Sequence, residues 1–320
     1  MIWALVPLFW AACIAAGYLY TQDRGVPWGV AQTVAPAFLL EATLFLALGV
    51  ERWRTRLDKL PRALVASLLV VAAVAPYAAA AIATGTFEWR ALAALAGLSA
   101  MLAFWYVALP HTPLSDLGLL ALAATVILTK VFGQLYVRPH EGLAIEVLGQ
   151  AMWIRTGLFA MLSVRRIQGV GFGFWPSGRE WKIGALHFAG LLPVAGGLGW
   201  WLAYTRPHMP AADWPTMLPL TFFGTLWVLA LSEEFFFRGL LQQWLCAWLK
   251  SAWAGWMSAS LLFGAVHVFY GQFPNWRFAA LATVAGIFYG SAFRTGHGIR
   301  ASMVTHALTV TTWKIFFSQT

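Results

Sequence analysis

Two adjacent carboxylates and an arginine interrupt a long apolar run near the middle of the second half of this sequence. No charged side chain occurs from residue 214 to residue 231, and Glu233, Glu234 and Arg238 then follow. An ionisable group at membrane depth costs roughly 3 kcal/mol on insertion scales and usually marks a functional site. On a helix, Glu234 and Arg238 can pair along one face, whereas Glu233 points about 100° away. We therefore expect Arg238 to neutralise Glu234 and to leave Glu233 free for chemistry.

Two histidines further along the chain are spaced so that they can face this segment. His267 closes the sequence Phe-Gly-Ala-Val-His that begins at Phe263, and His306 lies early in the last apolar segment. Counted at ~1.5 Å per residue from the turn near Lys250, Glu233 and His267 both lie ~22–24 Å deep on adjacent helices. The spacing therefore predicts a pair between Glu233 and His267, with His306 as a third member of the site.

A carboxylate with two histidines suits two kinds of chemistry. In the first, a partly buried carboxylate deprotonates water, one histidine orients that water, and the other donates to the oxyanion of a tetrahedral intermediate. In the second, three helices assemble a metal site from two histidines and a glutamate, although the zinc motif His-Glu-x-x-His is absent. A polar network that only joins helices is the third interpretation, and the matched depths favour a site over it.

The composition requires membrane helices to carry these residues. The 320 residues are 60% hydrophobic and 10% charged, whereas a soluble domain carries about 25% charged residues. We expect an all-α polytopic transmembrane bundle of about eleven helices, in which Gly286 and Gly290 give one helix a small face for close packing. The expected spans cover residues 2–20, 28–50, 63–84, 91–109, 117–136, 146–164, 183–204, 214–249, 253–270, 276–293 and 299–318.

The distribution of positive charge predicts the topology and the partners. The net charge is +9, and because basic residues cluster at helix ends, anionic lipid headgroups are expected as partners and nucleic acid is not. The basic loops 51–62 and 165–182 are separated by four expected crossings, so both can be cytoplasmic, as the positive-inside rule requires. We expect a multi-pass protein of the cytoplasmic (inner) membrane.

The order of these motifs resembles a known family. Glu233-Glu234-x-x-x-Arg238, then Phe263-x-x-x-His267, then His306 resembles the CPBP family of CAAX-processing and bacteriocin-processing (Abi) glutamic intramembrane proteases. The sequences Phe-Arg-Gly after the glutamates and Phe-Arg-Thr-Gly at 293–296 add to the similarity. The resemblance covers about residues 166–320, which we expect to form the catalytic bundle. Residues 1–165, an N-terminal block of about six helices, are unmatched.

The resemblance implies a membrane endopeptidase that needs neither a metal nor another cofactor. It implies the following catalytic residues: Glu233 as the water-activating base, His267 beside it, His306 on the oxyanion side, and Glu234 and Arg238 as orienting residues, with Phe263 as support. The family usually has Asn or Asp four residues after the last histidine, where this chain has Val310. Thr309 shares a helical face with His306 and is expected to supply the missing donor.

The expected substrate is a membrane protein or a lipid-modified peptide, cleaved near the membrane or at a C-terminal tag. Val310 supports one alternative, a catalytically weak or inactive scaffold or immunity-type protein of the same fold. A secondary transporter is a further alternative, suggested by the helix count and by Glu41 and Lys130 inside apolar runs, although the two halves show no convincing inverted repeat. For Glu41 and Lys130 we expect a structural ion pair or an interfacial position.

Overall fold

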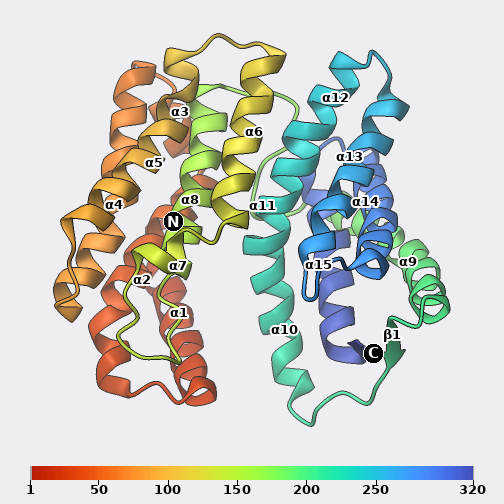
Figure 1. The fold of residues 1–320 in the computed structure, drawn as a ribbon, viewed down its shortest axis with the longest axis horizontal. Coiled ribbons are helices and arrows are strands. Elements are labelled where there is room, and N and C mark those ends of the chain that lie inside the picture. The colour runs from red at the N-terminus through yellow and green to blue at the C-terminus, as the bar shows by residue number, and fades with distance from the viewer. Residues whose placement is uncertain (1, 320) are drawn as a thin grey trace. The chain divides into compact units, whose positions relative to one another are not determined.

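Helices make up most of the structure, a computed structural model that describes residues 2–319 (Figure 1). The chain forms two compact units, the first ending at Ile167 and the second beginning at Gln168. Within the described residues, seven helices are long and apolar enough to cross a membrane by length and composition. The all-α polytopic fold is therefore confirmed, and each expected span has a helix as its counterpart.

The first unit is a bundle in which α8 packs against α2, α4 and α5. Proline and glycine mark its helix ends, with Pro27 before α2, Pro61 before α4, and Gly85 in the left-handed conformation after α4. Its helices are α1 (Ile2–Arg24), α2 (Trp28–Gly49), α3 (Glu51–Leu57), α4 (Arg62–Thr84), α5 (Trp89–Ala108), α6 (Pro113–Leu128), α7 (Phe132–Leu135) and α8 (Val147–Phe159), which continues as the π-helix η1 (Ala160–Val164).

A buried ion pair joins α2 to α8 in this unit. The Nε of Arg155 donates to Oε1 of Glu41 at 2.7 Å, and its Nη2 donates to Oε2 at 3.0 Å and to the Ala72 carbonyl at 3.0 Å. The expectation of an ion pair for Glu41 is confirmed, but its partner is Arg155, while Lys130 lies exposed beyond the end of α6. The planar guanidinium satisfies both carboxylate oxygens at once, which a lysine cannot do.

The second unit packs α9, α14 and α15 against one another, with α13 on α14. A two-stranded antiparallel sheet pairs Thr205 with Gln319 and Pro207 with Phe317, linking the chain just after α9 to the end of α15. Its elements are α9 (Gly178–Trp201), β1 (Thr205–Pro207), α10 (Trp214–Gly224), η2 (Thr225–Ala230), α11 (Leu231–Glu234), η3 (Phe235–Gln242), α12 (Gln243–Trp248), α13 (Ala252–Val266), η4 (His267–Phe269), α14 (Trp276–Gly296), α15 (Ile299–Phe316) and β2 (Phe317–Gln319).

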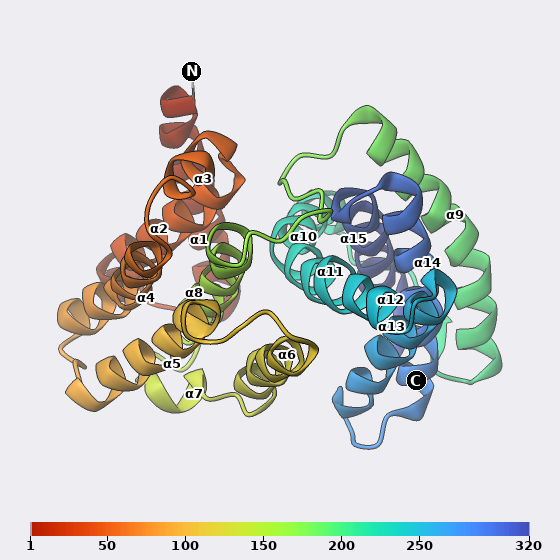
Figure 2. The ribbon, with the colours of Figure 1, turned by 90° about the horizontal axis from the view of Figure 1, so that it is seen from above.

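One long composite helix carries the two adjacent glutamates. Figure 2 shows α10, α11 and α12 following one another as a single run beside α15. Two stretches of this run, η2 and η3, are π-helical, and the single α-helical turn α11 with Glu233 and Glu234 lies between them. Wider π turns inside helices occur frequently at functional sites. The local backbone therefore sets the glutamate pair apart from the rest of the helix.

Glycines bring α14 close to its neighbours. A Cβ at Gly290 would lie 2.5 Å from the Trp256 ring and 2.6 Å from Oε1 of Gln242. A Cβ at Gly286 would lie 3.2 Å from the backbone of Ser260 in α13. The predicted small face at 286 and 290 is confirmed, and it allows side chains of the composite helix to reach the backbone of α14.

Candidate active site

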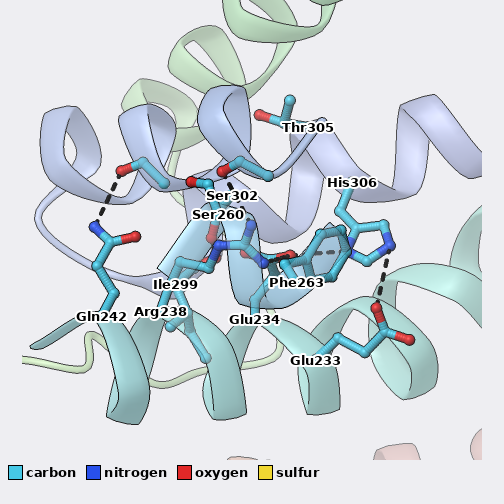
Figure 3. Close-up of polar contacts among 12 residues, drawn as sticks. Glu233, Glu234, Arg238, Gln242, Ser260, Phe263, Ile299, Ser302, Thr305 and His306 are labelled. Atoms are coloured by element: carbon cyan, nitrogen blue, oxygen red, sulfur yellow. Dashed lines mark hydrogen bonds and ion pairs between the residues drawn. The ribbon is translucent and has the colours of Figure 1, made fainter. Parts of the chain in front are cut away.

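Glu234 and Arg238 form the buried centre of a polar network in the second unit (Figure 3). The Nη1 of Arg238 donates to Oε1 of Glu234 at 3.1 Å, and the two side chains are 1% and 0% exposed. Their positions four residues apart on consecutive turns of one helix bring them together. The predicted neutralisation of Glu234 by Arg238 is therefore present.

Aromatic rings and a backbone carbonyl enclose the Arg238 guanidinium. Its Nη2 donates to the Gly286 carbonyl at 3.0 Å. Its carbon atom Cζ lies 4.5 Å from the ring centre of Phe263, 5.3 Å from that of Tyr289 and 5.8 Å from that of Phe237. A buried charge requires such partners, because removing an ion from water costs roughly several kcal/mol. The network is therefore assembled from the composite helix, α13 and α14.

Gln242 adds a second contact of the same kind one helical turn further on. Its side-chain nitrogen donates to the Gly290 carbonyl at 3.4 Å, and the side chain is fully buried. Figure 3 shows Gln242 and Arg238 on the same face of the helix. Sequence reasoning missed Gln242, although a glutamine four residues after Arg238 opposite a Gly-x-x-x-Gly pair is a signal that could have found it. The two contacts hold η3 against α14.

His306 lies between the two glutamates and is itself buried. Its Nδ1 is 2.8 Å from Oε1 of Glu234, and its Nε2 is 3.8 Å from Oε2 of Glu233. Because the Glu234 carboxylate accepts hydrogen bonds, we place a hydrogen on Nδ1, which donates it to Glu234. The other nitrogen, Nε2, is therefore directed at Glu233.

Glu233 differs from its neighbour in burial and in partners. Its side chain is 27% exposed, against 0% for Glu234. The Oε2 atom of each glutamate has no hydrogen-bond partner among the described residues, so this atom does not distinguish them. No arginine or lysine forms an ion pair with Glu233 in the described part of the chain, so the predicted difference between the two glutamates is present in the structure.

His267 stands at the end of α13 and takes other partners. Its Nδ1 lies 2.6 Å from the Phe263 carbonyl, and its ring centre is 5.2 Å from that of Phe278. Within residues 2–319, no hydrogen bond or ion pair joins it to Glu233, which contacts His306 instead. Phe263 contacts both histidines, with ring centres 4.6 Å from His267 and 6.1 Å from His306. The depth count assumed straight α-helices, whereas two π segments interrupt the composite helix.

Thr309 lies one turn beyond His306, but its hydroxyl hydrogen is already committed. Its Oγ1 donates to the Thr305 carbonyl at 2.7 Å. The next residue, Val310, carries no donor. In this conformation Thr309 therefore accepts hydrogen bonds but has no hydrogen left to donate, which does not match its expected role as an oxyanion donor.

Tyr289 belongs to the network and was missed in the sequence. Its ring stacks on the His306 imidazole, with ring centres 4.5 Å apart and planes 15° apart. It is 2% exposed and lies one residue before Gly290. The available signal was its place inside the sequence Gly-Ile-Phe-Tyr-Gly, where an aromatic side chain accompanies two glycines that pack closely.

The metal site that the sequence left open has no obvious ligand set in the structure. Among the residues that the structure describes, no group of three or more His, Cys, Asp or Glu side chains is arranged to hold a metal ion. Glu234, the most buried carboxylate, has both Arg238 and His306 on its Oε1. The arrangement resembles a hydrogen-bonded network with one less constrained carboxylate, Glu233.

Fold and site together define a polytopic helical membrane protein with a buried Glu-Arg-His network. Residues 215–312 match the family model of the type II CAAX prenyl endopeptidases, described as Rce1-like. The matched segment contains every site residue named above, and the predicted resemblance to the CPBP family is confirmed for it. Searches of curated proteins and of solved structures find no match. At the level of the family, the match supports a membrane endopeptidase.

Proposed function

We propose that this protein is a metal-independent, glutamic-type membrane endopeptidase in which Glu233 activates the attacking water. The observation that carries the proposal is the difference between the paired glutamates. Arg238 and His306 hold the fully buried Glu234, whereas Glu233 is 27% exposed and no arginine or lysine among the described residues pairs with it. A carboxylate of this kind can bind water and accept its proton. Glu234 and Arg238 then act as orienting residues.

The proposed reaction uses these residues as follows. Glu233 takes a proton from water, and the hydroxide attacks the carbonyl carbon of the scissile peptide bond. In its protonated form, His306 donates from Nε2 to the resulting oxyanion. Glu233 then gives its proton to the leaving nitrogen as the carbon–nitrogen bond breaks. His267, whose ring contacts Phe263, is assigned to orienting the water or the substrate.

The proposed substrate is a membrane-associated protein cleaved near its C-terminus, with a CAAX-type lipid-modified tail as the first candidate. The matching family, the type II CAAX prenyl endopeptidases, supports this choice. The seven apolar helices place the site in a multi-pass membrane protein. We assign the protein to the cytoplasmic membrane because its basic loops fit the cytoplasmic side.

The test measures cleavage of a fluorescence-quenched peptide that represents the C-terminal tail of a substrate. The full chain is reconstituted in proteoliposomes, and the peptide is supplied with and without a prenylated cysteine. Glu233→Gln keeps the shape of the side chain but cannot act as the base, and is expected to lower kcat at least about 100-fold. Glu88→Gln, at an exposed position before α5, is the matched control and should match wild type. Activity should survive strong chelators. Near-normal turnover by Glu233→Gln, or chelator inactivation reversed by zinc, would contradict the proposal.

A catalytically weak member of the same fold is the second candidate, and one observation favours it. Val310 has no donor, and the Thr309 hydroxyl donates to the Thr305 carbonyl. Loss of one oxyanion donor typically lowers kcat by about 10²–10³. If that donor limits turnover, Val310→Asn should raise kcat. The transporter alternative loses one of its two supports, because Glu41 is paired with Arg155.

A further inference from the structure

One buried aromatic residue, Tyr289, contacts three members of the proposed catalytic network: His306, Phe263 and Arg238. The Tyr289 ring stacks on His306 with ring centres 4.5 Å apart, and meets the edge of Phe263 with ring centres 5.9 Å apart. Its ring centre is 5.3 Å from the Arg238 guanidinium. A side chain that is 2% exposed cannot serve as a membrane-interface anchor. Its contacts point to a role inside the site.

The hydrogen bond to Glu234 holds one nitrogen of the His306 imidazole but does not by itself fix the plane of the ring. Packing against neighbouring side chains is needed to restrain that plane. The Nδ1 contact to Glu234 holds one nitrogen at 2.8 Å. The ring can still turn about the axis through that contact, and such a turn moves Nε2 away from Glu233. The parallel Tyr289 ring, inclined by 15°, blocks this rotation on one face, and Phe263, inclined by 88°, meets the ring edge-on.

The stacking contact also joins two helices. Tyr289 lies on α14 and His306 on α15, so the tyrosine ring links the two helices at the level of the imidazole.

From this geometry, and resting on the function proposed above, we propose that Tyr289 is a positioning residue. It holds the imidazole of His306 in the plane that directs Nε2 at Glu233. Its ring supplies the stacking surface, and the contacts of that ring with Phe263 and Arg238 keep it in place.

The test compares three substitutions in the full chain in proteoliposomes, with the peptide assay described above. Tyr289→Leu removes the stacking ring and is expected to lower kcat roughly 10–100-fold with little change in KM, because a small misplacement of a catalytic group has effects of this size. Tyr289→Phe keeps the ring and should recover most of that loss. Phe288→Leu, at the adjacent residue that lies beside Gly190 of α9, is the matched control and should behave as wild type.

A second measurement does not depend on activity. Residues in contact show non-additive effects in a double-mutant cycle, so the Tm shifts of Tyr289→Leu and His306→Ala in detergent should not add, whereas those of Phe288→Leu and His306→Ala should. An active wild type with an unchanged kcat in Tyr289→Leu, or additive Tm shifts for Tyr289 and His306, would overturn this inference alone. A wild type no more active than Glu233→Gln would overturn the proposed function and the catalytic role of Tyr289 with it.

Discussion

Two neighbouring glutamates of identical chemistry have different surroundings here, and their positions on the helix decide which is which. Glu234 is bound by His306 of α15 and by Arg238, one turn further along its own helix. Glu233, one residue earlier, is turned by about 100°, is partly exposed, and has no arginine or lysine partner among the described residues. Two consecutive residues of one helix can therefore have different roles. Glu234 holds the network together, and Glu233 is the residue proposed to do the chemistry.

This difference predicts unequal effects of the two isosteric substitutions on stability. Glu234→Gln removes the charge that compensates the buried Arg238 and should destabilise the fold by about 3–5 kcal/mol, because an uncompensated buried charge remains. Glu233→Gln should leave stability close to that of wild type. Thermal unfolding of the purified chain in detergent measures both. Adding Arg238→Met to Glu234→Gln should recover part of the loss, and equal Tm values for the two single variants would contradict the assignment.

His111, in the loop between α5 and α6, is expected to make the stability of the first unit depend on pH. Burial, Arg165 and Arg62 lower the pKa of His111, and Asp116 partly opposes them. The Arg165 Nη1 lies 2.9 Å from Nδ1 of this neutral ring. As pH falls through the ordinary value of 6.5, the unfolded chain binds a proton that the folded chain does not, so stability declines with falling pH.

The substitution that isolates this effect is His111→Gln, which keeps an acceptor for Arg165 but does not titrate. When the pH is lowered from roughly 8 to 5, the Tm of wild type should fall by more than the Tm of the variant. The difference should be small, because the side chain is exposed. Parallel Tm profiles over this range would show that His111 makes no contribution.

At the scale of elements, the sequence was a good guide to the helices and a poorer one to how they meet. Apolar runs bounded by Gly, Pro and charged residues predicted every long helix, because each run is long enough to cross a bilayer. The contact of Glu234 with Arg238 followed from helical spacing alone. The contact of Glu233 with His306 did not, because π segments on both sides of α11 change the direction of side chains that a straight helix would give.

Tyr289 and Arg155 illustrate the same limit. Each lies in an apolar helix where nothing in the local sequence names its partner, which is more than a dozen residues away along the chain: His306 for Tyr289, Glu41 for Arg155. Local propensity predicts that a helix forms, whereas packing between helices decides which side chains meet. The partner of a buried polar group is therefore the part of the site that needed the structure.

Close packing of α14 is the element-level feature that the site depends on most directly. Gly290→Ala places a Cβ 2.5 Å from the Trp256 ring and 2.6 Å from Gln242, and should destabilise the chain by about 1–3 kcal/mol as an overpacked core does. Gly197→Ala in α9, where an added Cβ meets nothing within 4 Å, is the control and should be neutral. Thermal unfolding in detergent distinguishes the two. Equal Tm values would show that α14 can move away at little cost.

At the scale of the whole molecule, the topology rests on two basic loops and on one contact between them. The two loops lie on the same side of the membrane only if four helices between them cross it. One of these helices, α6, has 16 residues and is shorter than the other three spans. Independently of this count, Nη2 of Arg166 donates to the Asp58 carbonyl at 2.6 Å, and α3 packs against η1. Residues of the two loops therefore lie at the same end of the first unit.

The prediction is that both loops, 51–62 and 165–182, are cytoplasmic, as their positive charge requires. After Cys13 and Cys246 are replaced by serine, single cysteines at Arg56 and Arg179 should resist a membrane-impermeant maleimide in intact cells and react once the cells are permeabilised. A cysteine at Glu88, in the loop at the opposite end of α4 and α5, should react in intact cells. Arg166 holds the two loops together. Labelling of the cysteine at position 56 and protection of the one at position 88 in intact cells would therefore show that the first unit has the opposite orientation. Labelling of the cysteine at position 179 alone would show that the second basic loop is not on the same side as the first.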